Sequence, residues 1–216
     1  MTRTLKAPSP RRYARDSLEF GRVVNLSDAV FAIALTLLVL NLEVPDVPAR
    51  ELGDALSDQW SELIAFALAF LLVANVWWQH HKICAVLNWF EPGMIALNVV
   101  CLAGVALAPF PTSLVGAAPG TRAAVLPFIA LFMLLSMLWL ALILRAHAVG
   151  AWRTPMPAHV YPWLVADWLA SIAALGVALL VALAAPIAGL VALVVASSVV
   201  VLTMGRLGPT ERKAWF

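Results

Sequence analysis

Charged side chains are scarce in this chain of 216 residues. They make up 12% of the sequence, whereas 63% of the residues are hydrophobic; a soluble domain is typically about 25% charged and about 45–50% apolar. A soluble monomer could not bury that much apolar surface. The composition therefore excludes an ordinary soluble domain and indicates a protein of the lipid bilayer.

Sequence features typical of enzymes and metal proteins are also lacking. The two cysteines, Cys84 and Cys101, fall near the end of one apolar segment and inside the next, which is not the pattern of a disulfide framework. No Ser–His–Asp arrangement is recognisable, and the adjacent His80 and His81 have no further ligands at a metal-binding spacing. We expect no enzyme activity, no cofactor, no metal and no nucleic-acid partner.

Long apolar segments, separated by charges and prolines, predict an all-α membrane protein with six transmembrane helices. A helix needs roughly 20 mostly apolar residues to cross the hydrocarbon. The stretch between Asp167 and Arg206 contains no charge and is too long for one span, and Pro186 with Gly189 divides it where a turn would fall. The other four spans are predicted over Val23–Leu42, Trp60–Gln79, Met94–Val115 and Ala123–Leu144.

The distribution of basic residues predicts the orientation. With six spans and a cytoplasmic N-terminus, all of the 14 Lys and Arg residues except Arg50 and Arg122 fall on the cytoplasmic side, as the positive-inside rule requires. We divide the chain into a cytoplasmic arm (1–21), a transmembrane domain (22–206) and a cytoplasmic tail (207–216). The charged arm is too long for a simple cleaved signal peptide.

The first predicted span differs from the others because it carries several polar residues. Asp28 is either a structural carboxylate with a partner or a functional group, since an acid at membrane depth is costly. At about 100° per residue, Ala29, Ile33, Thr36, Leu37 and Leu40 share one stripe and Asp28 lies off it. The stripe alone is compatible with lipid contact, ordinary helix packing or a pore lining.

Three separated motifs carry a resemblance to a known family. Residues 22–40, with the sequence RVVNLSDAVFAIALTLLVL, resemble the first-helix signature of the transmembrane protein 175 family of potassium channels, R-x-x-x-F-S-D followed by an apolar run. Leu26 replaces the aromatic residue of that signature. Trp77 followed by His80 and His81, and Asn98 followed by the Pro-Phe-Pro-Thr motif at 109–112, also resemble the family. The similarity covers about the first half of the chain.

The resemblance implies a function and an assembly. In that family the six-helix bacterial chains form tetramers whose first helices surround the pore, without the TVGYG loop of other potassium channels. It places the narrowest constriction at Ile33, further apolar layers at Leu37 and Leu40, and hydroxyl groups at Thr36. We therefore expect a homotetramer in the bacterial inner (plasma) membrane with a hydrophobic gate, which conducts K+ with modest selectivity over Na+ and other monovalent cations.

The resemblance also implies a polar network that braces the first helix near its cytoplasmic end. Its members are Arg22, Ser27, Asp28, Trp77, His80 and His81. One of the two histidines is expected to bridge Arg22 and Asp28, either as a fixed brace or as a gate that depends on histidine protonation.

Three other functions remain compatible with the sequence. A secondary ion or proton-coupled transporter would also be a six-helix bundle with buried charges, although no inverted repeat is visible. A membrane enzyme would need convergent catalytic groups, which the sequence does not show. A membrane scaffold without transport activity is the third.

Overall fold

The computed structural model describes residues 11–209, so residues 1–10 of the predicted arm and 210–216 of the predicted tail lie outside the described part. Its elements, in chain order, are β1 (Tyr13–Ala14), α1 (Leu18–Leu37), η1 (Leu38–Asn41), α2 (Leu52–Ser57), α3 (Trp60–Val86), β2 (Trp89–Phe90), α4 (Pro92–Leu107), α5 (Pro109–Ala117), α6 (Arg122–Ala148), α7 (Val160–Ala184) and α8 (Pro186–Leu207).

Within the described residues, six helical segments are long and apolar enough to cross a membrane, which confirms the predicted fold class. They are Leu18–Asn41, Trp60–Val86, Pro92–Ala117, Arg122–Ala148, Val160–Ala184 and Pro186–Leu207. The first helix begins at Leu18 rather than Val23, because Ser17 caps it by accepting a hydrogen bond from the Phe20 backbone N–H at 3.2 Å. The second helix continues past Gln79 to Val86, since His80 and Ile83 are buried rather than at the membrane surface.

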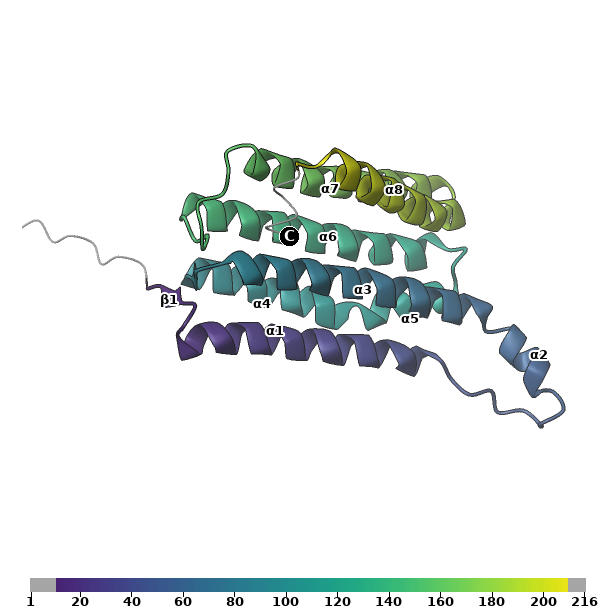
Figure 1. Cartoon of the computed structure of the whole chain (residues 1–216). Coiled ribbons are helices and arrows are strands. Elements are labelled where there is room, and N and C mark those ends of the chain that lie inside the picture. Colours follow the sequence, from purple (N-terminus) through teal and green to yellow (C-terminus); the bar gives the residue numbers. More distant parts are fainter. Residues whose placement is uncertain (1–10, 210–216) are drawn as a thin grey trace, which may run out of the picture.

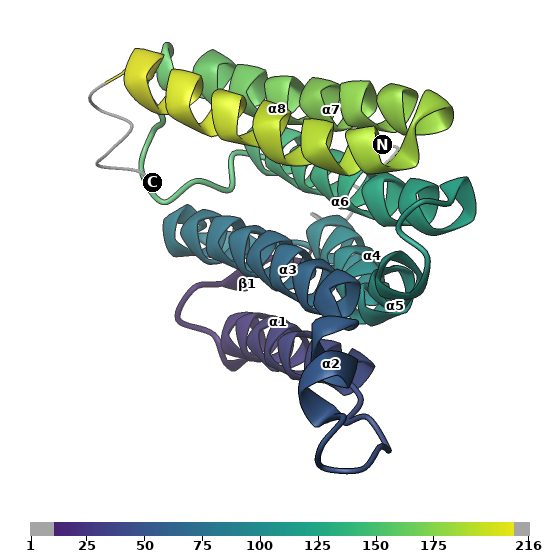
Figure 2. The same ribbon diagram turned by 90° about the vertical axis from the view of Figure 1, so that its right-hand side faces the viewer.

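The helices are stacked in layers (Figures 1 and 2). α1 forms one outer layer and packs on α3 and α4. α6 crosses the middle of the molecule, where it contacts α4 and α5 on one side and α7 and α8 on the other. The α7–α8 hairpin forms the opposite outer layer, far from α1.

The third transmembrane segment is broken where the sequence places Pro109. α4 ends at Leu107, and α5 starts at Pro109, which has no backbone N–H to continue the helical ladder. The Thr112 hydroxyl donates to the Ala108 carbonyl at 2.8 Å, and the Asn41 side-chain amide donates to the Pro109 carbonyl at 3.4 Å. The Pro109 carbonyl at the break thus accepts a hydrogen bond that connects η1, which follows α1, to the third transmembrane segment.

A short antiparallel pairing of β1 with β2, which we did not predict, fixes the start of α1. The Arg15 guanidinium donates to the carbonyls of Cys84, Ala85 and Leu87, each at 3.0 Å. Carbonyls at a helix C-terminus have no partner within the helix. Arg15 therefore ties the chain before α1 to the end of α3.

Candidate functional site

The two faces of α1 have opposite environments. Ser27, Phe31, Ala34 and Leu38 are at most 1% exposed and face the rest of the protein. On the other face, the exposed fractions are 58% for Ile33, 40% for Leu37 and 69% for Leu40, and Thr36 is exposed between them. Leu38 and Leu40 belong to η1, which continues α1 in the same span. All four residues of the predicted pore lining thus lie on one face of the α1–η1 segment that the other described residues leave uncovered.

Thr36 is the polar member of this exposed face. Its hydroxyl donates to the Ile33 carbonyl at 2.8 Å. Because the hydrogen is engaged within the helix, the oxygen lone pairs are what Thr36 offers to the outside. An oxygen acceptor of this kind suits a cation better than an anion.

Behind this face, Asn98 of α4 joins Ser27 to His80. The Asn98 amide donates to the Ser27 hydroxyl at 2.9 Å, and its carbonyl oxygen lies 3.3 Å from His80 Nε2. All three side chains are buried. We did not include Asn98 among the predicted site residues, although an amide inside an apolar span is itself a signal of a buried polar contact.

Asp28 is held by a tryptophan rather than by a histidine. Trp77 Nε1 donates to Asp28 Oδ1 at 3.0 Å. His81 is exposed and stacks on Trp78, with ring centroids 5.7 Å apart, and it reaches the Asp28–Trp77 pair only through a ring contact with Trp77.

The six predicted network residues therefore fall into separate groups. Ser27 and His80 are linked through Asn98, and Asp28 and Trp77 are linked directly. Arg22 is exposed on α1 and makes no hydrogen bond or ion pair with any residue from 11 to 209. The expected histidine bridge between Arg22 and Asp28 is not formed in this subunit.

Acidic and amide groups surround the other end of α1. Asn41, Glu43, Gln59, Glu62 and Thr112 are among the residues that line a cavity of about 310 Å³ there. The Gln59 side-chain amide donates to the Glu43 carbonyl at 2.8 Å, which attaches the loop after η1 to the start of α3. This arrangement places carboxylates at the end of the exposed stripe, where they would raise the local concentration of cations.

Comparison with known proteins finds similar sequences for the first half of the chain. Residues 22–109 match the family model described as the endosomal/lysosomal potassium channel TMEM175. A potassium channel of Streptomyces collinus is 39% identical over 98 residues, which cover 44% of this chain and 47% of that protein. A potassium channel of Chamaesiphon minutus is 36% identical over 104 residues, covering 47% of this chain and 51% of that protein. The chain thus spans about half the length of the curated relatives it matches.

A solved structure extends the similarity to the rest of the fold. The crystal structure of a lysosomal potassium-selective channel TMEM175 homolog from Chamaesiphon minutus superposes with a TM-score of 0.75 over 86% of this chain and 98% of that one, at 24% identity. The predicted resemblance is therefore confirmed: residues 22–109 are similar in sequence to the TMEM175 family of potassium channels, and the fold is similar to that of the Chamaesiphon minutus homolog over 86% of the chain.

Proposed function

We propose that this chain forms a potassium-permeable channel as a homotetramer, in which the exposed face of α1 lines the pore. The observation that carries the proposal is the uncovered stripe of Ile33, Thr36, Leu37 and Leu40, within the segment that matches the family model. Residues 11–209 of a single subunit place no second wall opposite this stripe, so several copies are needed to enclose a path for ions.

The side chains of the stripe suggest how such a pore would control permeation. Rings of Ile33 and Leu40 form apolar constrictions, and a cation entering them must lose water without gaining polar ligands. Widening of the rings lets partly hydrated ions pass. Potassium holds its water less tightly than sodium, so this barrier favours potassium modestly, and the Thr36 oxygens add weak ligands between the rings.

Replacement of Ile33 by Asn tests the constriction. If the isoleucine ring contributes even ~1.4 kcal/mol to the barrier, its loss raises the resting current about tenfold, and the preference for K+ over Na+ falls. The measurement is current through purified protein in planar bilayers with K+ and Na+ on opposite sides. Ile187→Asn is the matched control, because Ile187 is 60% exposed on α8 and should leave current and ion preference unchanged.

Unchanged current and ion preference in Ile33→Asn would remove Ile33 from the pore. A reversal potential that depends on a second, coupled ion would instead indicate a secondary transporter and overturn the channel proposal.

Cadmium block of Thr36→Cys tests the position of the pore independently. A ring of thiols facing a narrow path binds Cd2+ and stops the current, whereas the unmodified protein should be insensitive, because Cys84 and Cys101 are both buried. Current that is equally insensitive in the variant would place Thr36 outside the permeation path.

A further inference from the structure

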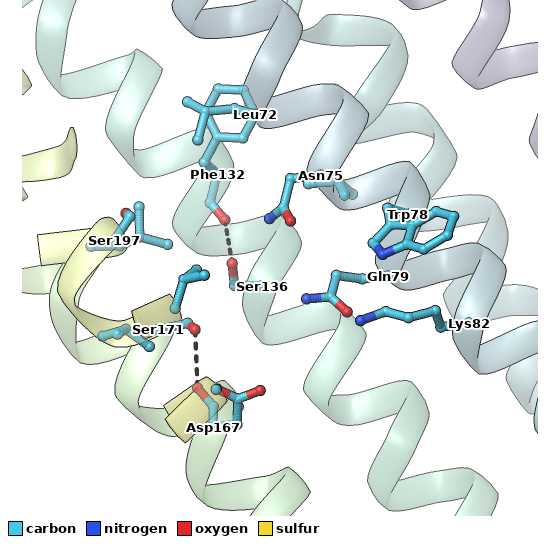
Figure 3. Close-up of a pocket in the computed structure, with 15 residues that line it drawn as sticks. Leu72, Asn75, Trp78, Gln79, Lys82, Phe132, Ser136, Asp167, Ser171 and Ser197 are labelled. Atoms are coloured by element: carbon cyan, nitrogen blue, oxygen red, sulfur yellow. Dashed lines mark hydrogen bonds between the residues drawn. The ribbon is translucent and has the colours of Figure 1, made fainter. Parts of the chain in front are cut away.

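A polar cavity lies within the other side of the subunit, between α3, α6, α7 and α8. Its volume is about 350 Å³, and its polar lining includes Asn75, Gln79, Lys82, Ser136, Asp167 and Ser171. Figure 3 shows the polar ends of Asn75, Gln79 and Lys82 directed from α3 toward the side on which Ser171 and Asp167 lie. None of these residues belongs to the α1 face.

The cavity extends along α3 from near one end of the helix toward its middle. Lys82 and Gly205, near the ends of α3 and α8, line its outer part. Asn75 is eleven residues before the end of α3, which corresponds to about 16 Å along the helix axis. Polar side chains far from the end of a transmembrane helix are costly unless they face polar partners. We therefore expect the occupant of the cavity to carry polar groups.

The two walls of the cavity offer opposite chemistry. The α3 wall supplies the Lys82 ammonium and the amide donors of Asn75 and Gln79. On the opposite wall, the Ser171 hydroxyl donates to the Asp167 carbonyl at 3.0 Å and the Ser136 hydroxyl to the Phe132 carbonyl at 2.9 Å. Their hydroxyl hydrogens are engaged, so these serines present oxygen lone pairs to the cavity, which Asp167 also lines. One wall suits an anion and the other a cation.

An apolar groove of about 500 Å³ continues from this cavity between α3 and α8. Leu72, Asn75, Ser197 and Val201 line both spaces. The rest of the groove is almost entirely apolar, with Leu68, Leu71, Leu193 and Val194 among its lining residues. The polar cavity thus continues into an apolar groove between α3 and α8. This combination matches an amphipathic lipid, which has a polar headgroup and an apolar acyl chain.

We propose that this site binds one zwitterionic phospholipid with a primary amine, a phosphatidylethanolamine. The phosphate binds at Lys82, the ammonium donates to Asp167 and the serine oxygens, and one acyl chain lies in the α3–α8 groove. Lys82 and Asp167 also interact with other groups of the protein, and the headgroup adds to these interactions. The headgroup of phosphatidylglycerol has no ammonium to donate to Asp167, and that of phosphatidylcholine has no N–H.

Native mass spectrometry of the purified full-length protein, titrated with dioleoyl lipids of the three headgroups, tests the proposal. Phosphatidylethanolamine should bind more tightly than the other two. Lys82→Gln should weaken its binding about tenfold, the usual effect of losing a hydrogen bond to a charged group. Asp167→Asn should abolish the preference for phosphatidylethanolamine over phosphatidylcholine. Arg153→Gln is the control, because Arg153 is exposed and does not line the cavity.

A second pair of variants tests the groove. Val194→Trp should fill it and weaken phosphatidylethanolamine binding, whereas Val199→Trp should not, since Val199 is similarly exposed on α8 (52% against 48%) but does not line the groove. Soluble glycerophosphoethanolamine, which has the headgroup without acyl chains, should not compete.

Three results would overturn the lipid assignment. The first is equal binding of all three lipids. The second is effective competition by the soluble headgroup, which would indicate a phosphate site without a lipid chain. The third is a change in subunit number with Val194→Trp at unchanged lipid binding, which would make the groove a contact between copies of the chain.

Discussion

Asn98 occupies the middle of three polar side chains that are buried between α1, α3 and α4. Replacement by Leu keeps the branching and the number of heavy atoms of the side chain but leaves Ser27 and His80 without their shared partner. We expect Asn98→Leu to lower the free energy of unfolding by about 1–2 kcal/mol, near the upper end for hydrogen bonds within membranes.

Thermal unfolding of the purified variant in detergent measures this loss. Asn88→Leu provides the comparison, because Asn88 lies exposed in the turn after α3 and its backbone N–H keeps its bond to the Ala151 carbonyl. Equal melting temperatures for the two variants would show that the Asn98 bonds contribute no net stability.

Sequence reasoning reached some of these residues and missed others for a physical reason. Helical periodicity placed Asp28 off the exposed stripe, and its bond to Trp77 agrees with that direction. The choice between Trp77 and a histidine as its partner depends on how α3 is rotated against α1, which spacing along one chain does not specify. Similarly, Asn98 is distant from Ser27 in sequence, and only the packing of α4 brings them together.

At the scale of the elements, Gly189 permits the close contact between α7 and α8. A Cβ atom at this position would lie 2.7 Å from Cα of Ala182 and 2.9 Å from its backbone nitrogen, both in the backbone of the other helix. We expect Gly189→Ala to separate the hairpin and cost about 1–3 kcal/mol, the usual range for overpacking.

The matched control for this variant is Gly176→Ala, because a Cβ at Gly176, on α7, meets no atom within 4 Å. That substitution should be neutral or slightly stabilising, since alanine favours a helix more than glycine does. Melting temperatures in detergent compare the two. An equal effect at both positions would show that helix propensity, and not the contact with Ala182, decides the outcome.

The membrane-spanning helices were predictable because hydropathy alone identifies segments that must avoid water. The turn at Pro186 was also predictable, since proline removes a backbone donor whatever its surroundings. The same property of Pro109 accounts for the break between α4 and α5, within the span predicted over Met94–Val115. The β1–β2 pairing and the short helix α2 were not. They form outside the apolar segments, where a few residues such as Tyr13 and Phe90 pair only because the helices have already brought them together.

At the scale of the whole molecule, six spans require both described ends of the chain to emerge on one side of the membrane. Asp16 precedes α1 and Asp46 follows η1, so cysteines placed at these positions should lie on opposite sides. A membrane-impermeant thiol reagent, added to sealed right-side-out vesicles, should label Asp46→Cys at once and Asp16→Cys only after permeabilisation. The reverse pattern would invert the predicted orientation.

The assembly is the level at which sequence patterns say least. Periodicity separates the exposed stripe of α1 from its buried face. The same stripe is nevertheless compatible with contact to lipid, to a neighbouring helix or to water in a pore. The expectation of a tetramer came from the resemblance and not from residue spacing. Cross-linking of Leu40→Cys between copies would address it directly, because Leu40 is the most exposed of the three apolar stripe residues.

The three carbonyls bound by Arg15 also limit how α1 can move. A movement of α1 that keeps these bonds is a swing about its start, which shifts the packing of η1 on α3 and α5 and the 3.4 Å hydrogen bond from Asn41 to the Pro109 carbonyl. Any such swing displaces Leu40 most and Ile33 less, in proportion to their distance from the fastening. In the proposed channel, such a swing would widen the ring of Leu40 before the ring of Ile33.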